Sequence, residues 1–328
     1  MFALIPTGAL AVEEIQAIKS KIWQLIKSPE IERSLPSILY HYTDAAGLKG
    51  IIESGTLRAT HIAFMNDASE YLHGVNLLAG SIHDAKASST GKDKQNLLEL
   101  MEPAVAGTRP ENVAPYFVVC FSEQENSLNQ WRAYGRAEGG FAIGFDGGAL
   151  ERTAATQSTL LAPALYARDK QAKLVRELLD WALEEYPKRA LNYPESQKQE
   201  HLLNWAHYFL WFAAGTAPIL KNPDFAEEAE WRIIFMLRSN RQVQYSPKPT
   251  GLVPFVALKM GVSQAAPPLL DLAHDSLTSF PDKLPIISVW SGPGRATDIS
   301  LLAAESLLEK NNYDGVQLHA SKIPYRIG

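Results

Sequence analysis

Tyr-Phe-Val-Val-Cys-Phe at residues 116–121 is the stretch of sequence that decides the fold class. The run is apolar throughout, is rich in residue types that favour β-strands, and is too short for a buried helix. It therefore predicts a buried strand. Working outward, further strands are expected in similar short runs, and residues 56–64 are expected to be extended. The runs lie at 37–42, 141–145, 160–166, 231–237, 253–258, 284–289 and 315–318.

Helical periodicity appears between these runs. Ile15, Ile18, Ile22 and Leu25 lie on one face of a helix predicted at 12–27. Asp44–Ser54 is predicted to be a helix that Gly55 ends. Other helices are expected at 67–85, 95–102, 126–134, 169–185, 197–212 and 299–309.

Strands and helices do not alternate regularly, and no Gly-x-Gly-x-x-Gly or Gly-Lys-Ser motif is present. A Rossmann fold or a P-loop is therefore disfavoured. The pattern predicts an α+β fold in a single domain, residues 1–328. We expect a leader helix within residues 1–30 and a helical insertion at 167–225.

Composition restricts the possible functions. The 328 residues carry a formal net charge of −5, which gives no general attraction to nucleic acid or to an anionic membrane. The single cysteine, Cys120, excludes an internal disulfide and a multi-cysteine zinc site, and the histidine spacing predicts no metal site. No signal peptide and no membrane-spanning run is predicted, so we expect a cytoplasmic protein.

Two polar motifs lie in the first part of the chain. His41 is at a predicted strand end, where its ring can hold a polar ligand or carry a proton, and Tyr42 and Thr43 follow it. The alternative is a structural histidine beside a helix cap formed by Thr43 or Asp44. Asp67 and Glu70 have the spacing of a capping box, which explains both residues. The preceding Asn66 has no such structural explanation.

The middle of the chain carries a third motif. Ser122 ends the strand at 116–121, and the helix predicted at 126–134 contains Trp131 and Tyr134 among several polar residues. These aromatic side chains can border a ligand pocket or pack in the core, and core packing is the more common outcome at helical spacing.

A fourth motif is Glu-Glu-Ala-Glu-Trp-Arg-Ile-Ile at 227–234. In an extended chain Glu228, Glu230 and Arg232 project to one face. Two carboxylates there can orient a ribose hydroxyl and stabilise a developing positive charge. The alternative is a solvated acidic segment in which Arg232 forms a surface salt bridge.

Taken together, the motifs resemble the bacterial family called domain of unknown function 2971, over residues 39–326. The resemblance rests on segments that follow one another in order. They are Leu-Tyr-His-Tyr-Thr at 39–43, Gly-Ile-Ile-Glu-Ser-Gly-Thr-Leu-Arg-Ala at 50–59, Met-Asn-Asp-Ala-Ser-Glu at 65–70, Cys-Phe-Ser at 120–122, Gln-Trp-Arg-Ala-Tyr-Gly at 130–135, Gly-Phe-Ala-Ile-Gly-Phe at 140–145, the segment at 227–234 and Ser-Lys-Ile-Pro-Tyr-Arg at 321–326.

The opening motifs are also similar to those of the DNA-modifying ADP-ribosyltransferase toxins. This second resemblance implies a split β-sheet core and NAD as a substrate, without a metal. It implies a catalytic acid at Glu230, paired with Glu228, and His41 on the NAD ribose. The remaining NAD-binding residues that we expect are Tyr42, Thr43, Asn66, Ser122, Trp131, Tyr134 and Arg232.

The expected function is therefore NAD-dependent ADP-ribosyl transfer or NAD hydrolysis, in a toxin or phage-defence effector that modifies a protein or nucleic-acid acceptor. A non-catalytic nucleotide- or ligand-binding module is the main alternative. A third alternative, nucleic-acid processing, requires a basic groove that the overall charge does not indicate.

Overall fold

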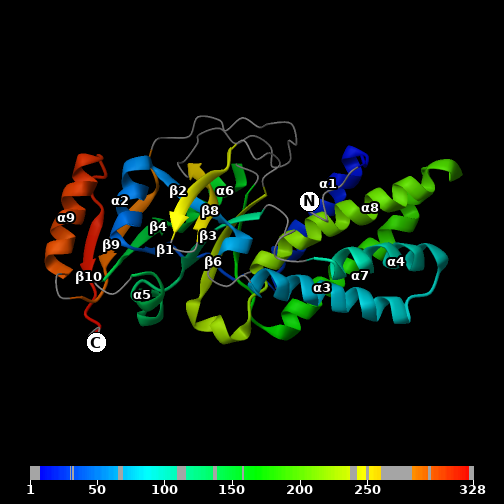
Figure 1. Cartoon of the computed structure of the whole chain (residues 1–328), viewed down its shortest axis with the longest axis horizontal. Coiled ribbons are helices and arrows are strands. Elements are labelled where there is room, and N and C mark those ends of the chain that lie inside the picture. The colour runs from blue at the N-terminus through cyan, green and yellow to red at the C-terminus, as the bar shows by residue number, and fades with distance from the viewer. Residues whose placement is uncertain are drawn as a thin grey trace.

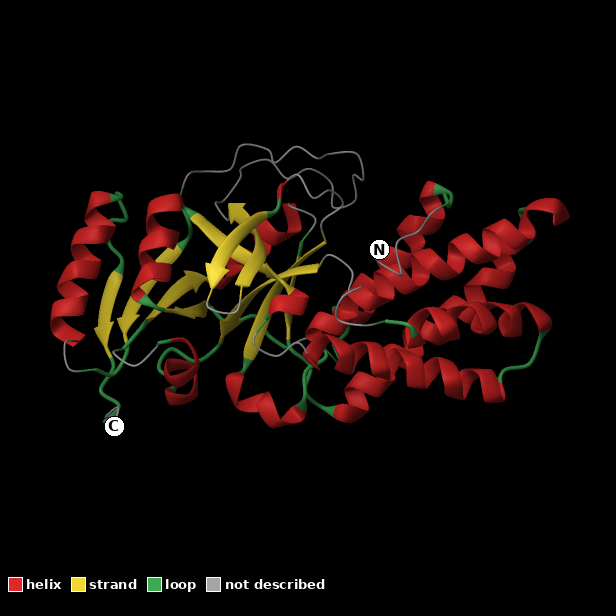
Figure 2. Ribbon diagram, in the orientation of Figure 1, coloured by secondary structure: helices red, strands yellow, loops and turns green. Residues whose placement is uncertain are grey.

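The computed structural model of the chain describes residues 8–29, 31, 33–65, 69–108, 116–135, 139–156, 159–236, 242–248, 251–259, 283–294 and 297–324. The molecule is elongated, with a β-sheet at one end and a group of long helices at the other (Figures 1 and 2). The mixed α+β class predicted from the sequence is confirmed.

The sheet is mostly antiparallel. Its order is β10-β9-β4-β1-β3-β2-β8-β7, with β6 on the remaining edge of β3 and β5 on β6; only β9 and β10 are parallel among the described pairs. The strands are β1 (Ile38–Thr43), β2 (Thr56–His61), β3 (Tyr116–Ser122), β4 (Phe141–Asp146), β5 (Leu160–Pro163), β6 (Glu230–Met236), β7 (Gln244–Lys248), β8 (Gly251–Lys259), β9 (Ile286–Ser291) and β10 (Gln317–Ala320).

The helices fall into two groups. Five of them pack on one another and are called the helical lobe below: α1 (Val12–Ile26), α3 (Ser69–Ser88), α4 (Lys92–Ala106), α7 (Arg168–Ala190) and α8 (Lys198–Ala213). The helices α2 (Ala45–Ser54), α5 (Leu128–Tyr134), α6 (Gly147–Thr156) and α9 (Thr297–Lys310) lie on the sheet. Short 3-10 turns include η1 (Ile62–Phe64), η3 (Glu195–Gln197), η4 (Ala214–Ile219) and η5 (Pro223–Glu228).

The strand β3 has a forked neighbourhood. It pairs with β6 over its whole length, so that only one edge is left for other strands. On that edge β1 pairs at Ser122, whereas β2 pairs at Phe117 and Val118. The strands β1 and β2 therefore diverge along β3, and we call the gap between them the fork.

Each face of the sheet has its own core. On one face, Leu39, Phe121 and Ile143 pack with apolar side chains of α2, α6 and α9. On the other face, Val118 and Ile234 pack against the helical lobe, while Trp131 of α5 covers Tyr40 and Tyr42. This second face is thus covered from two sides, by α5 at one end of the sheet and by the helical lobe at the other.

Local signals explain both ends of α2. The Asp44 carboxylate accepts a hydrogen bond from Gly47 N at 2.8 Å, and Gly55 ends α2 at a φ of 59°. This confirms the predicted helix, with Asp44 rather than Thr43 as its cap. No helix among the described residues is long and apolar enough to cross a membrane.

The structure also corrects several expectations. A helix that is not among those predicted, α6, begins at Gly147, because Asp146 Oδ1 accepts a hydrogen bond from Ala149 N at 2.7 Å and caps the helix. The edge strand β7 escaped prediction because its pairing with β8, not its own apolar pattern, makes it a strand. The segment between β5 and β6 consists of α7, η3, α8, η4 and η5, and α1, α3 and α4 pack with α7 and α8 in the helical lobe.

Candidate functional site

The segment that carries Glu228 and Glu230 is not extended throughout. Glu228 ends η5, Ala229 follows with a φ of 43° and a ψ of 51°, and Glu230 begins β6. A left-handed conformation at a residue other than glycine costs about 1–3 kcal/mol and persists only where its surroundings impose it. The two-residue periodicity predicted for Glu228 is therefore wrong, but the turn at Ala229 still directs both carboxylates to one lysine.

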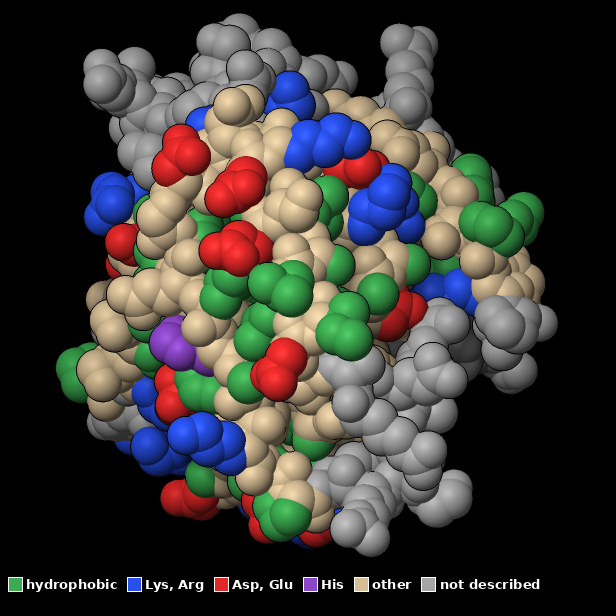
Figure 3. Space-filling view, turned by 90° about the vertical axis from the view of Figure 1, so that its left-hand side faces the viewer, with side chains coloured by type: hydrophobic (Ala, Val, Ile, Leu, Met, Phe, Trp, Pro, Cys, Tyr) green, Lys and Arg blue, Asp and Glu red, His purple; other side chains and the backbone are tan. Residues whose placement is uncertain are grey.

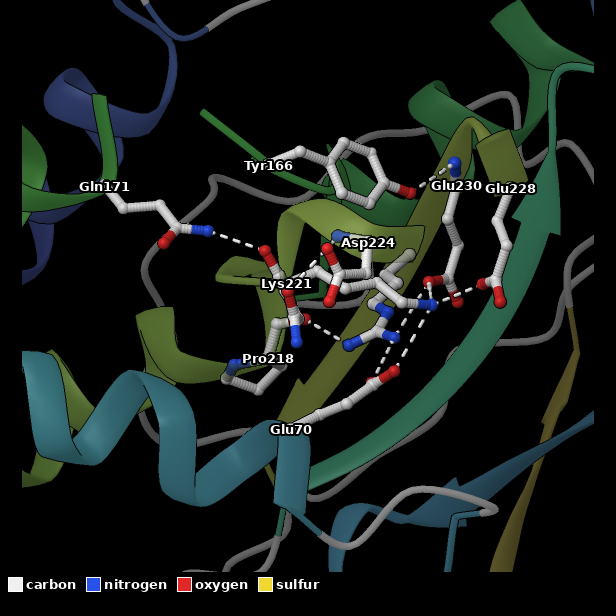
Figure 4. Close-up of polar contacts among 10 residues, drawn as sticks. Glu70, Tyr166, Gln171, Pro218, Lys221, Asp224, Glu228 and Glu230 are labelled. Atoms are coloured by element: carbon white, nitrogen blue, oxygen red, sulfur yellow. Dashed lines mark hydrogen bonds and ion pairs between the residues drawn. The ribbon is translucent and has the colours of Figure 1, made fainter. Parts of the chain in front are cut away.

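That lysine is Lys221, in the loop between η4 and η5. Its ammonium contacts Glu230 Oε2 at 2.6 Å and Glu70 Oε1 at 3.2 Å, and it donates a hydrogen bond to Glu228 (Figure 4). Glu70 comes from α3, so the contact joins the helical lobe to the sheet.

Arg232 lies two residues after Glu230 in β6, on the same face of the sheet, and completes the network. Its guanidinium contacts Glu70 at 2.6 Å and Glu230 at 2.8 Å, and it donates to Pro218 O at 2.5 Å. The arginine is 1% exposed, so it does not form the surface salt bridge considered as an alternative. Three carboxylates and two cations share this network, which leaves an excess of one negative charge when all are ionised.

The two carboxylates near Ala229 have different environments. Burial alone would raise the pKa of Glu230, but Arg232 and Lys221 outweigh it and lower that pKa to about 2. Burial raises the pKa of Glu228, and the hydrogen bond from Lys221 offsets this only in part. Glu230 is thus held as an anion, whereas Glu228 takes up a proton more readily than an ordinary glutamate.

The network reaches solvent on one side. The Glu228 side chain is 26% exposed, against 6% for Glu230. Cys120 is partly exposed although β3 has neighbours on both edges. Tyr134 of α5 is 36% exposed, and its pKa is raised first by burial and then by electrostatic interaction with Cys120 and Glu230, so its hydroxyl lies within electrostatic range of the network.

Two further aromatic rings adjoin the same residues. The Tyr166 hydroxyl accepts a hydrogen bond from Glu230 N at 3.0 Å. The ring of Phe225, which is 36% exposed, lies 5.3 Å from the Lys221 ammonium. Glu228, Tyr134 and Phe225 are therefore the members of this group that a ligand can reach most directly.

His41 lies on the other side of the sheet. Tyr40, Ser122 and Glu230 are opposite one another in β1, β3 and β6, so their side chains share a face and His41 points away from it. Its ring packs edge-on at 5.9 Å from Phe121, and Nδ1–H donates to Cys120 O at 2.8 Å. The structure thus does not bring His41 and Glu230 together on one face; His41 fills the fork.

Three of the predicted NAD-binding residues, Tyr42, Ser122 and Trp131, make structural contacts around the loop between β3 and α5. The Tyr42 hydroxyl donates to Gln124 O at 2.7 Å. The Ser122 hydroxyl donates to Glu228 O at 2.7 Å, which fixes the backbone next to Ala229. Trp131 is buried against Tyr42 and is a core residue, so of the two aromatic candidates only Tyr134 borders the network.

The remaining predicted residues differ in position. Thr43 ends β1 opposite Phe141 and is partly buried, on the side of the sheet to which His41 points. Asn66 lies outside the described residues. Within the described ranges, no group of three or more His, Cys, Asp or Glu residues is suited to a metal ion.

Sequence reasoning missed Lys221 and gave Glu70 only a capping role. The available signal was weak: Lys221 is the first charged residue after a long apolar run, at 208–219, that packs in the core. Glu70 lies far from Lys221 in the sequence, and a turn separates Lys221 from Glu230, so no local pattern joins the lysine to these partners.

A separate hollow of about 410 Å³ lies elsewhere and shares no residue with the network. It is lined by Ile52, Glu53, Ser54, Gly55, Lys259, Lys283, Asn311, Asn312 and Tyr313. The end of the molecule formed by α9, α2 and β10 shows acidic and basic side chains intermixed, without an extended basic surface on that face (Figure 3).

Comparison with known proteins adds one match. No curated protein and no solved structure matches the chain. A family resemblance was predicted for residues 39–326, and it is confirmed over a part of that range that contains Tyr134, Lys221, Glu228 and Glu230. Residues 130–233 match the model of the family described as "Protein of unknown function (DUF2971)".

Proposed function

We propose that this chain transfers ADP-ribose from NAD to an acceptor, or to water, with Glu230 and Glu228 at the reaction centre. The observation that carries the proposal is the pair of carboxylates on Lys221, one with a pKa of about 2 and one with a raised pKa. In enzymes, two neighbouring carboxyl groups with different pKa values commonly have different roles. The group with the low pKa stays ionised and stabilises positive charge in the transition state, while the group with the raised pKa transfers a proton.

Glu230 would act on the first half of the reaction. The bond between C1′ of the ribose and the nicotinamide nitrogen breaks, the electron pair leaves with nicotinamide, and positive charge develops on the ribose. A carboxylate that stays ionised and fixed stabilises this charge without reorganising. Lys221 and Arg232 hold Glu230 in that state, at 2.6 and 2.8 Å.

Glu228 would act on the second half. A hydroxyl or amine of the acceptor, or a water molecule, forms a bond to C1′, and its proton moves to the Glu228 carboxylate and then to solvent. The partial exposure of Glu228 supports this role, because the proton must leave the site. The products are nicotinamide, the ADP-ribosylated acceptor or ADP-ribose, and one proton.

The charge of the network supports a cationic ring as the leaving group. Its excess negative charge favours the pyridinium of NAD over neutral nicotinamide, and the exposed rings of Tyr134 and Phe225 offer contact surfaces for a planar group. Binding the reactant ring more tightly than the product ring also favours product release.

An ADP-ribosyltransferase-like core is part of the same proposal. Its support is the order β1-β3-β6, which places the His-Tyr-Thr, Cys-Phe-Ser and Glu-x-Glu motifs on neighbouring strands, together with the fork. His41 would contact a ligand in such a site only through the fork and only with Nε2, because its Nδ1–H already donates a hydrogen bond to Cys120 O.

One observation favours a second candidate, a binding module without turnover. The Glu230 carboxylate is buried and already paired with two cations, so a ligand could be held by Glu228 and Tyr134 without reaching it. Calorimetric titration with NAD and measurement of nicotinamide release, with protein, nucleic acid or water as acceptor, separate the two. Release supports the transferase or hydrolase, binding without release supports the module, and the absence of both overturns the NAD proposal.

A further inference from the structure

Lys221 needs an explanation for its fixed position, because it lies in neither a helix nor a strand. Its side chain is 4% exposed and its ammonium contacts three carboxylates, so a small displacement of the backbone would change all three contacts. The backbone is held in part by Leu165, whose carbonyl accepts from Lys221 N at 3.1 Å. This hydrogen bond and the one from Leu165 N to Ile219 O at 2.7 Å join the loop to the segment that follows β5, but do not by themselves connect it to the helical lobe.

Gln171, in the first turn of α7, makes that connection. Its Nε2 donates to Lys221 O at 2.7 Å (Figure 4). It also donates to Leu165 O at 2.6 Å, so both amide hydrogens are used. Its Oε1 lies 3.1 Å from His73 Nε2, which donates to it. The side chain is 1% exposed, so water cannot replace these bonds easily.

The helix α3 contributes to both ends of this arrangement. Glu70 and His73 are three residues apart and therefore lie on one face of α3. Glu70 binds the Lys221 ammonium, while His73 orients the amide that binds the Lys221 carbonyl. The main chain and the side chain of Lys221 are thus both held from the helical lobe.

We propose that Gln171 is a positioning residue, which transmits the placement of α3 and α7 to Lys221 and so fixes its ammonium between Glu228 and Glu230. The catalytic consequence of this role rests on the proposed function, whereas the positioning itself does not. The helical lobe then acts as the rigid support of the site and not as a separate appendage.

The test is a titration of Glu228, followed by the ¹³C resonance of its carboxyl group in protein labelled at glutamate and assigned by comparison with Glu228→Gln. In Gln171→Leu the ammonium is less well held, so the Glu228 midpoint should rise by about half a unit or more. Tyr193→Phe, which removes a 2.9 Å hydrogen bond to Glu14 elsewhere in the helical lobe, should leave the midpoint unchanged. An unchanged midpoint in Gln171→Leu, or an equal shift in both variants, overturns the proposal.

A second pair of variants covers the case in which Gln171→Leu does not fold. His73→Leu should shift the midpoint in the same direction, and His73→Gln, which keeps a donor for Oε1, should restore part of it; equal midpoints in the two overturn the proposal.

If the wild type releases nicotinamide, Gln171→Leu should lower kcat roughly 10- to 100-fold with little change in KM. It should also move the acid limb of the pH profile to higher pH. A shifted Glu228 midpoint without any release in the wild type would retain the positioning role and remove the proposed reaction.

Discussion

Glu230 is the residue on which turnover should depend most. Glu230→Gln keeps the shape of the side chain and removes its charge, so nicotinamide release should fall by on the order of 100-fold or more, the scale of losing one preorganised electrostatic group. The effect should appear mainly in kcat, because the carboxylate acts on the charge that develops in the transition state. Circular dichroism checks that the variant is folded. Equal rates in wild type and variant would remove Glu230 from the mechanism.

Glu230 and Glu228 should affect the free energy of unfolding with opposite dependence on pH. The pKa of Glu230 is lowered from 4.5 to about 2, so its contribution is present above pH 4.5 and is lost as the pH falls toward 2. The destabilisation caused by Glu230→Gln should therefore shrink over that interval.

The pKa of Glu228 is raised, so its ionised form is disfavoured in the folded state. Glu228→Gln should consequently cost little or no stability at neutral pH, where Glu230→Gln costs most. Urea unfolding of both variants between pH 2.5 and 7.5 measures the difference, because this range contains the ordinary glutamate value of 4.5 and most of the interval down to the Glu230 value of about 2. A larger loss at neutral pH in Glu228→Gln than in Glu230→Gln would contradict the assignment.

At the scale of elements, the fork between β1 and β2 leaves a backbone carbonyl of β3 without a partner strand on that edge, so a side chain has to supply the hydrogen-bond donor. Along this edge of β3 neither strand pairs with Cys120, and the Cys120 carbonyl finds its partner in His41 Nδ1 at 2.8 Å. His41→Ala leaves this carbonyl without its partner, so the free energy of unfolding should fall by about 1–3 kcal/mol.

Chemical denaturation measures this loss, and His41→Asn, which retains a donor, serves as the matched variant. If His41 only closes the fork, nicotinamide release per folded molecule should change much less in His41→Ala than in Glu230→Gln. A loss of release as large as that of Glu230→Gln, with the stability unchanged, would instead make His41 a ligand-binding residue.

Short-range patterns explain how much of these elements could be predicted. The strand at 116–121 and the helix at 44–54 carry their own signals, an apolar β run and a cap with a glycine stop, and both were found. The helix α6 was missed because two glycines at its start indicate a turn unless the capping role of Asp146 is recognised. The turn at Ala229 was missed because alanine carries no signal for a left-handed conformation.

The whole molecule sets the limit for the site. Arg232 and Glu70 are 162 residues apart in sequence, and each motif alone has an adequate local explanation. Which glutamates meet Lys221 follows from the packing of α3 against the sheet, which periodicity does not specify. The sequence could thus nominate Glu228 and Glu230, but it could not show that they share a lysine or that His41 faces away from them.

The placement of Glu70 has a consequence for the order in which the chain can mature during synthesis. Glu70 leaves the ribosome long before Lys221 and Arg232, and β3 emerges long before β6, its partner along the whole length. A carboxylate cannot be buried without its cations except at a cost of several kcal/mol. The packing of α3 against the sheet therefore has to wait until residues 221–232 have been synthesised. The sheet and the helical lobe then pack against each other at this late step.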